Sequence, residues 1–418
     1  MIQVIEPGIR CGKISAPSSK SQVHRLLICA ALSEQDALIS CQGISKDIAA
    51  TIACLNGLGA QISVENDTIL VKPIQKRAGD RVILKCGESG STLRFLLAVA
   101  GALGADAEFQ MEGRLPERPM KEYEQVLRAH GMQIFREGSS LYCKGQLTAG
   151  EFSLPGNISS QYFSGLLFAL PLLKEESIIK IEGRLESAGY VAMTEAALKL
   201  SQICLKKNTD GYEIPAGQKY CFSQEITAEG DYSNGAFFLC AGAMSEEGIE
   251  VENLSEKSVQ GDRKITDVLA SFGAEVTVRE NSVFVKKGNL HGCEIDASMI
   301  PDLIPVLSVV AAVSTGMTRI VHGERLRMKE SDRIKSTVNM LLSLGADVSE
   351  TSDGMEIRGQ SELSGGKEID SCGDHRIAMS AAIGACMCRD KVTINGAECV
   401  QKSYPAFWND FQSLEVIQ

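Results

Sequence analysis

The chain repeats a pattern of helix, glycine and strand with a regular period of ~70 residues. Four short stretches carry the pattern most clearly, GLGAQI, AHGMQI, SFGAEV and SLGADV, and their glycines are Gly59, Gly131, Gly273 and Gly345. The first and last pairs of these glycines have equal separations, and the middle separation is close to twice as long. A glycine after an amphipathic segment, followed by alternating apolar residues, predicts a helix C-cap and then a strand. A repeat of this length builds a fold from copies of one supersecondary unit.

A second series of segments has the same period. Apolar segments that predict helices begin near Ser21, Ser91, Ser160, Tyr232, Asp302 and Asp374. Each of these starts follows the one before it by nearly the interval that separates Gly59 from Gly131. The sequence therefore predicts six such units, each with two helices and several short strands. Strands that alternate with helices indicate an α/β (α+β) fold class.

Six units can form one ring-like solenoid or two domains of three units. The polar stretch FSQEITAEGDYSNG near the middle of the chain is typical of a crossing between domains. The N-terminal strand has no complete unit of its own, and the last unit lacks a strand. We therefore expect residues 1–12 and 228–418 to form one discontinuous domain, closed by the N-terminal strand. Residues 13–227 form the inserted domain, and the active site is expected in the cleft between the two.

Composition and charge exclude several kinds of protein. The net charge of -11 argues against a nucleic acid or an anionic membrane as partner. The 14 cysteines include no CxxC pair and the five histidines are scattered, so no metal site is expected. The absence of a GxGxxG or P-loop motif leaves a nucleotide cofactor unsupported. The N-terminus reads as a strand and not as a signal peptide, so a cytoplasmic protein is expected.

The starts of the predicted first helices carry serine, glycine and basic residues. A helix start binds anions through its free N–H groups and the positive end of its dipole. Serine also caps helices without any ligand, which is the simpler interpretation for one such start. Three starts at the same phase of consecutive repeats favour an anion site instead; their residues are Lys20, Ser21 and Arg25, then Gly90, Ser91 and Arg94, then Ser159, Ser160 and Gln161.

The stretch RLRMKESDRI adds charge near the start of a second helix. Six of the nine residues from Arg325 to Arg333 are charged. This is typical of a solvated helix face, but it also suits an anion clamp, since Lys329 and Arg333 lie one helical turn apart. Further basic residues near helix starts are Arg118, Arg376 and Lys402. Together they predict a cationic cleft for small ligands with phosphate and carboxylate groups.

Two carboxylates fall at helix starts on the same side. Asp302 can be a simple N-cap, and Glu330 can be a helical partner of Arg333. The other interpretation makes them a general base and a general acid.

Eight motifs in order resemble the 5-enolpyruvylshikimate-3-phosphate synthase family. They are SKSQVHR, GESGSTLRF, ERPM, SSQY, IPDL, KESDR, DHRIAM and CVQKSYP, and they span the whole chain. The resemblance implies an inside-out, barrel-like enolpyruvyl transferase architecture with six βαβαββ units in two domains. It implies transfer of the enolpyruvyl group of phosphoenolpyruvate to the 5-hydroxyl of shikimate 3-phosphate. The implied reaction passes through a tetrahedral ketal and uses no metal, no cofactor and no covalent enzyme intermediate.

The same resemblance implies a role for each matching residue. Asp302 is the expected base on the 5-hydroxyl, Glu330 the proton donor to the methylene carbon, and Lys20 a contact of both substrates. The residues implied for shikimate 3-phosphate are Lys20, Ser21, Arg25, Ser159, Ser160, Gln161, Ser187, Asp302 and Lys329. Those implied for phosphoenolpyruvate are Lys20, Gly90, Arg118, Gln161, Arg333, Arg376 and Lys402. No membrane partner is implied, and a monomer is expected.

The chain departs from the family pattern at Glu88, Ser91, Phe95 and Arg325, and the sequence assigns no role to Arg327. Three other functions stay open. One is enolpyruvyl transfer to UDP-N-acetylglucosamine by the same repeat. Another is an RNA-end cyclase with related units, and the third is a non-catalytic module that binds sugar phosphates.

Overall fold

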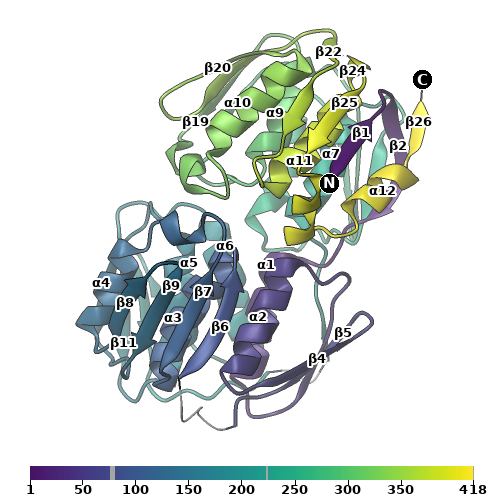
Figure 1. Ribbon diagram of the computed structural model, residues 1–418. Coiled ribbons are helices and arrows are strands. Elements are labelled where there is room, and N and C mark those ends of the chain that lie inside the picture. Colours follow the sequence, from purple (N-terminus) through teal and green to yellow (C-terminus); the bar gives the residue numbers. More distant parts are fainter. Residues whose placement is uncertain (76–80, 223–224, 418) are drawn as a thin grey trace. The chain divides into compact units, whose positions relative to one another are not determined.

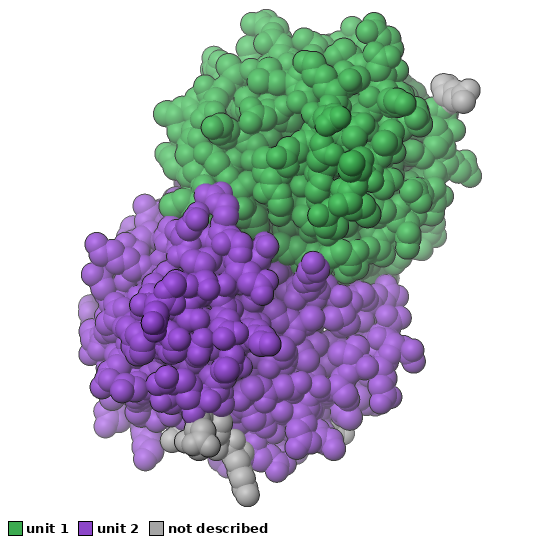
Figure 2. Space-filling model, in the orientation of Figure 1, with its two compact units in different colours: residues 1–19, 229–418 green, residues 20–228 purple. Residues whose placement is uncertain are grey.

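The structure is a computed structural model that describes residues 1–75, 81–222 and 225–417. The chain divides into two compact units, shown in two colours in Figure 2. Unit 1 consists of Met1–Ser19 and Glu229–Gln418, and unit 2 consists of Lys20–Ala228. Each unit has a hydrophobic core of its own. Among the described residues, no helix has the length and apolar character that crossing a membrane requires.

The second repeat shows the plan of the units most simply. Its first strand pairs in parallel with its second, the second pairs antiparallel with the fourth, and the fourth pairs antiparallel with the third. A helix occupies the first connection, because parallel neighbours need a crossover. The elements of this repeat are β6 (Val82–Gly87), α3 (Gly90–Leu103), β7 (Ala107–Met111), the 3₁₀ helix η1 (Leu115–Glu117), α4 (Lys121–Ala129), β8 (Gln133–Glu137) and β9 (Ser140–Lys144).

The other two repeats of unit 2 follow this βαβαββ plan. In the first repeat the parallel first strand is β14, which comes from the far end of the unit and pairs with β3. The first repeat contains α1 (Lys20–Ala31), β3 (Ala37–Ser40), α2 (Lys46–Gly57), β4 (Gln61–Glu65), β5 (Thr68–Lys72) and β14 (Glu225–Thr227). The third contains β10 (Glu151–Pro155), α5 (Ser160–Ala169), η2 (Leu170–Leu172), β11 (Ser177–Glu182), α6 (Ala188–Leu200), β12 (Lys206–Asn208) and β13 (Gly211–Ile214).

Unit 1 holds the fourth, fifth and sixth repeats. The fourth contains β2 (Ile9–Ser15), α7 (Tyr232–Ala243), β15 (Ile249–Glu252), η3 (Gly261–Lys264), α8 (Ile265–Ser271), β16 (Glu275–Arg279) and β17 (Ser282–Lys286). The fifth contains β18 (Glu294–Asp296), α9 (Ile304–Val313), β19 (Met317–Val321), η4 (Glu324–Met328), α10 (Arg333–Leu344), β20 (Asp347–Glu350) and β21 (Met355–Arg358). The sixth contains β22 (Leu363–Gly365), β23 (Glu368–Asp370), α11 (His375–Ala385), β24 (Cys388–Asp390), β25 (Val392–Asn395), η5 (Ala397–Lys402), α12 (Phe407–Ser413) and β26 (Glu415–Ile417).

The N-terminal segment forms two strands where the sequence analysis expected one. β1 (Ile2–Ile5) pairs with β25 of the sixth repeat, and β2 pairs in parallel with β15 of the fourth. Pro7 and Gly8 separate the two strands, since proline donates no ladder hydrogen bond and Gly8 has a φ of 143°. Because β2 continues to Ser15, this segment of unit 1 extends to Ser19 and does not stop at residue 12.

The first helix of each repeat in unit 1 is buried inside the unit. α7, α9 and α11 pack on one another, and each also contacts strands of its own repeat (Figure 1). The described strands form seven separate sheets, and none of these closes into a barrel. The structure therefore confirms the predicted mixed α/β class. It also brings the N-terminal ends of these three helices together, as the side-chain contacts below show.

Candidate active site

Arg333 is the centre of a buried charge cluster in unit 1. It is the first residue of α10, and only 2% of its side chain is exposed. Its Nη1 donates to Asp302 Oδ1 at 2.7 Å and its Nη2 to Glu330 Oε2 at 2.7 Å. Its Nε donates to Asp374 Oδ2 at 2.8 Å. One guanidinium thus pairs with three carboxylates in a place where water is largely excluded, so it is held rigidly.

A second arginine shares one of these carboxylates. Arg376, in the first turn of α11, donates from Nη2 to Asp302 Oδ2 at 3.0 Å and from Nη1 to the Asp302 carbonyl at 3.0 Å. Its Nη2 also reaches Ser233 Oγ at 2.7 Å, at the start of α7. Asp302 therefore bridges two guanidinium groups, and the starts of α7, α9 and α11 meet at this point.

The structure argues against the N-cap interpretation of Asp302. The N-cap residue of α9 is Leu303, and α9 has no side-chain cap hydrogen bond. The Asp302 side chain turns instead to the two arginines. Asp374 does cap its helix, since it accepts from the backbone N–H of Arg376 at 3.0 Å. Glu330 pairs with Arg333 three residues later, as the simpler interpretation expected, although it precedes α10 and so is not a helical residue. It lies in the same cluster as Asp302.

The charges around Asp302 and Lys329 shift their pKa values strongly. Burial alone would raise the pKa of Asp302, but the cations of Arg376, Lys329 and Arg333 hold that pKa well below its usual value. Burial lowers the pKa of Lys329 to about 7, with Asp302 opposing this change and Arg325 and Arg333 adding to it. Asp302 is therefore ionised at neutral pH, whereas Lys329 loses its proton far more readily than an ordinary lysine.

Lys402 lies in the neighbouring sixth repeat. It is the last residue of η5 and is buried. The residue after it, Ser403, is joined to α7, because Asn234 Nδ2 donates to the Ser403 carbonyl at 3.4 Å. The end of η5 is thus attached to the same helix start that carries Ser233.

In unit 2, Lys20 and Arg25 are held by internal partners. Lys20 begins α1 and pairs with Asp47 of α2, with Nζ 2.9 Å from Oδ2. Arg25 is 2% exposed and donates to Thr194 Oγ1 at 2.8 Å and to the carbonyls of Ser21 and Tyr190 at 2.5 and 2.7 Å. Burial lowers the pKa of Arg25 to about 10, so it stays a cation at neutral pH.

The start of α3 gathers another group of predicted residues. Arg94 Nη1 donates to Gln161 Oε1 at 2.8 Å, and Gln161 Nε2 donates to Ser91 Oγ at 2.9 Å. A Cβ atom on Gly90 would lie 2.5 Å from Arg94 Nη1 and 2.9 Å from Arg118 Nη1. Only glycine leaves both guanidinium groups where they are, so Gly90 is required for this cationic start.

The predicted serines of unit 2 divide into two kinds. Ser159 is an ordinary N-cap, since it accepts from the Gln161 N–H at 3.3 Å, and Ser160 begins α5 in a buried position. Ser187 precedes α6 without capping it, and its φ of 54° and ψ of 38° are left-handed. A buried serine in this conformation is uncommon and stores strain of about 1–3 kcal/mol, which is typical of functional positions.

A buried chain of polar groups joins α1, α2 and α3. His24 Nδ1 lies 2.7 Å from Thr51 Oγ1, and Thr51 Oγ1 lies 2.7 Å from Thr92 Oγ1. Thr92 donates to Ser89 Oγ at 2.7 Å, so Thr51 must donate to Thr92 and His24 must donate from Nδ1–H. Burial lowers the pKa of His24 to about 3, which keeps the ring neutral. This chain fixes the turn that precedes Gly90.

Sequence reasoning missed Asp374, Ser331 and Asp47. Asp374 is fully buried, and besides Arg333 it accepts from Ser331 Oγ at 3.1 Å. It stands inside the motif DHRIAM, directly before His375 and Arg376. Its position at a helix start close to an arginine could have marked it as a candidate site residue. Asp47 offered a weaker signal, because it pairs with Lys20 across 27 residues of sequence.

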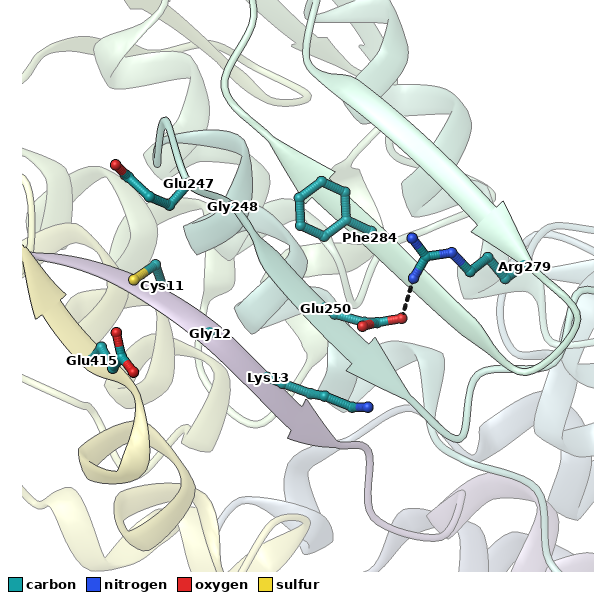
Figure 3. Close-up of a pocket in the computed structure, with 9 residues that line it drawn as sticks. All are labelled: Cys11, Gly12, Lys13, Glu247, Gly248, Glu250, Arg279, Phe284 and Glu415. Atoms are coloured by element: carbon teal, nitrogen blue, oxygen red, sulfur yellow. Dashed lines mark hydrogen bonds and ion pairs between the residues drawn. The ribbon is translucent and has the colours of Figure 1, made fainter.

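A pocket of about 400 Å³ lies elsewhere in unit 1 (Figure 3). It is on the sheet of the fourth repeat, where Arg279 and Glu250 form an ion pair. It contains none of the predicted site residues; its lining is Cys11, Gly12, Lys13, Glu247, Gly248, Glu250, Arg279, Phe284 and Glu415. Within the described ranges, no group of three or more His, Cys, Asp or Glu side chains is arranged to hold a metal ion.

Comparison with known proteins gives matches along the whole chain. A family model described as EPSP synthase (3-phosphoshikimate 1-carboxyvinyltransferase) matches residues 8–411. A 3-phosphoshikimate 1-carboxyvinyltransferase of Clostridium acetobutylicum is 44% identical over 416 residues, which cover 98% of this chain and 96% of the relative. A protein of the same name from Clostridium perfringens is 43% identical over 98% of this chain and 97% of its own length.

A solved structure supports the same relationship. The EPSP synthase of Acinetobacter baumannii superposes with a TM-score of 0.82 at 25% identity, over 100% of this chain and 99% of that chain. Motifs, fold and whole-chain similarity agree, and the chain belongs to the EPSP synthase (3-phosphoshikimate 1-carboxyvinyltransferase) family.

Proposed function

We propose that this chain transfers the enolpyruvyl (1-carboxyvinyl) group of phosphoenolpyruvate to the 5-hydroxyl of shikimate 3-phosphate and releases phosphate. Family membership supports the reaction. The observation that carries it in the structure is the contact of one buried arginine, Arg333, with both Asp302 and Glu330. Anion-binding cations and two carboxylates in one cluster are what transfer between two anions by proton catalysis requires.

The proposed chemistry has two halves. In the first, Glu330 protonates the methylene carbon of phosphoenolpyruvate, the 5-hydroxyl oxygen bonds to the adjacent carbon, and Asp302 takes the hydroxyl proton. This gives a tetrahedral ketal. In the second, the new methyl group returns a proton to Glu330, the carbon–oxygen bond to phosphate breaks, and the proton on Asp302 leaves with the phosphate. Atoms and protons balance without a metal or a cofactor.

The ion pairs of the free protein suggest how the carboxylates become active. Arg333 and Arg376 hold the pKa of Asp302 far below its usual value, so Asp302 is a weak base in this state. An incoming phosphate or carboxylate group that binds these arginines offsets part of their positive charge. The pKa of Asp302 then rises, and Glu330 loses part of its attraction to Arg333 in the same way. Substrate binding would thus switch on the acid and the base together.

We assign the remaining contacts from the motif resemblance to the family, residue by residue. Cations with donors placed at helix starts suit phosphate and carboxylate oxygens. For shikimate 3-phosphate the groups are Lys20, Ser21, Arg25, Ser159, Ser160, Gln161, Ser187, Asp302 and Lys329. For phosphoenolpyruvate they are Lys20, Gly90, Arg118, Gln161, Arg333, Arg376 and Lys402.

We further propose a monomer in the cytoplasm. Two separate hydrophobic cores let the chain fold without a partner. The 14 cysteines are all free, which suits a reducing compartment.

The test is phosphate release from phosphoenolpyruvate, with shikimate 3-phosphate or UDP-N-acetylglucosamine as acceptor and EDTA present. Release with shikimate 3-phosphate alone is the expected result, and it would also show that no metal is needed. Release with UDP-N-acetylglucosamine alone would mean that this sugar nucleotide is the acceptor in place of shikimate 3-phosphate. Binding of shikimate 3-phosphate without release under any condition would favour the non-catalytic sugar-phosphate module and remove Asp302 and Glu330 from their roles.

A further inference from the structure

Lys329 and Glu330 lie on a short link without regular secondary structure. The link runs from the end of η4 at Met328 to the start of α10 at Arg333. Lys329 itself has an extended backbone, with φ of -89° and ψ of -159°. Such a link lacks the repeating backbone hydrogen bonds of a helix or strand, so contacts with neighbouring elements help to fix the direction of its side chains.

Arg327 joins this link to a neighbouring hairpin. Its Nη1 lies 2.7 Å from Glu350 Oε1, at the end of β20. Its Nη2 donates to the carbonyls of Thr351 and Ser352 at 3.1 and 3.3 Å, in the turn before β21. Its Nη1 also reaches Asp332 Oδ2 at 3.4 Å, and Asp332 is the N-cap of α10. Arg327 and Asp332 thus connect the two sides of the Lys329–Glu330 segment.

The same hairpin turn also holds the residues before η4. Asp353 Oδ2 accepts from the His322 N–H at 2.8 Å, and the Asp353 carbonyl accepts from the Gly323 N–H at 2.6 Å. The far end of the link is attached to α11, because Ser331 donates to Asp374. These contacts and the Glu330–Arg333 pair hold the link in place. Arg327 is the residue among them whose side chain bonds to both the hairpin and the N-cap of α10.

We propose that Arg327 is a positioning residue for Lys329 and Glu330: its guanidinium ties the link to the turn at Thr351–Ser352 and to the α10 cap. The inference rests on the proposed function of Lys329 and Glu330. Lysine cannot replace arginine here, since one ammonium group lacks the planar fork that reaches a carboxylate and two carbonyls at once.

The experiment compares kcat and KM for both substrates in the full chain carrying Arg327→Gln, Arg327→Lys or Glu350→Gln. We expect Arg327→Gln to lower kcat about 10- to 100-fold even at saturating substrate, because a displacement near 1 Å has an effect of this size. Arg327→Lys should recover only a small part of the loss. The matched control is Arg358→Gln, which removes the Arg358–Asp347 pair on the same hairpin, 3.6 Å long, and should keep kcat within about twofold.

Amide hydrogen exchange supplies the second readout. In Arg327→Gln, peptides that cover residues 329–332 should exchange faster, while the body of α10 from Ser336 onward stays protected. A kcat within twofold of the parent for Arg327→Gln, or full recovery by Arg327→Lys, would overturn the proposal. So would a loss of kcat with unchanged exchange at residues 329–332. Turnover of the parent chain tests the proposed function separately, because the proposal here concerns only the ratio between variant and parent.

Discussion

Arg333 and Asp302 are joined by a bond of 2.7 Å, so the cation that suits an anionic substrate is also the one that neutralises the proposed base. Asp302→Ala should therefore keep binding of shikimate 3-phosphate and lose turnover by about 10²- to 10⁴-fold, the usual contribution of a general base. Calorimetric binding and phosphate release measure the two effects. Asp302→Asn keeps the size of the side chain and should lose the same turnover. Unchanged turnover in either variant would remove Asp302 as the base.

Lys20→Met should abolish turnover. Lys20 is the proposed contact of both substrates, and its Nζ is held 2.9 Å from Asp47 Oδ2. Methionine keeps the length of the side chain without its charge, and the expected loss in kcat is at least about 10³-fold. The matched control is Lys46→Met, on the exposed first residue of α2, which should leave kcat unchanged. A higher KM for one substrate with normal kcat would contradict the shared contact.

Gly90→Ala should weaken phosphoenolpyruvate binding without unfolding the chain. The new Cβ would meet Arg94 Nη1 at 2.5 Å and Arg118 Nη1 at 2.9 Å, and these are the far ends of flexible side chains. The guanidinium groups can move, so we expect KM for phosphoenolpyruvate to rise about tenfold and the melting temperature to change little.

The control for this change is Gly235→Ala in α7. There the nearest atoms to the new Cβ would be in the side chains of Leu254 and Val251, at 3.2 Å and beyond, and none of them belongs to a predicted substrate contact. Its KM for phosphoenolpyruvate should equal that of the parent. An equal rise in both variants would mean that Gly90 acts through general packing.

The positions of the helices could be predicted because each start and end depends on local chemistry. The period placed the starts of α1, α3, α5, α7, α9 and α11 close to where they lie. Gly345 caps α10 with a φ of 93°, as its place after an amphipathic segment indicates. The site residues at these starts followed from the same signal, together with the resemblance to the family.

Pairings between distant segments could not be predicted in this way. β14 completes the first repeat beside β3, although the whole of the second and third repeats lies between the two strands, and no local pattern marks that pairing. The charge of Arg327 was visible in the sequence, but its partners at Glu350, Thr351 and Ser352 depend on where the hairpin folds back. The sequence around Asp374 indicates only the start of a helix. Its contact with Arg333 could not be predicted, because Arg333 lies 41 residues earlier in the chain.

Lys329 gives a further prediction, a dependence of substrate affinity on pH. Burial lowers its pKa from 10.5 to about 7 in the folded chain. Its ammonium form, which attracts the anionic substrate, is therefore lost as the pH rises through 7. We expect the Kd for shikimate 3-phosphate, measured by calorimetry, to increase from pH 6.5 to pH 8.5. Lys329→Met should bind more weakly and lose this dependence, whereas Lys335→Met, on an exposed position of α10, should keep it.

The same shift has a consequence for stability that can be measured without substrate. Between pH 7 and pH 10.5 the unfolded chain holds a proton on Lys329 that the folded chain has released. The unfolded state binds more protons in that window, so the contribution of this group makes the free energy of unfolding rise with pH. Below pH 7 both states are protonated and the contribution is constant. Urea unfolding of the parent and of Lys329→Met at pH 7, 8 and 9 isolates the effect: the difference between the two chains should change with pH, and a difference that stays constant would mean that Lys329 keeps an ordinary pKa.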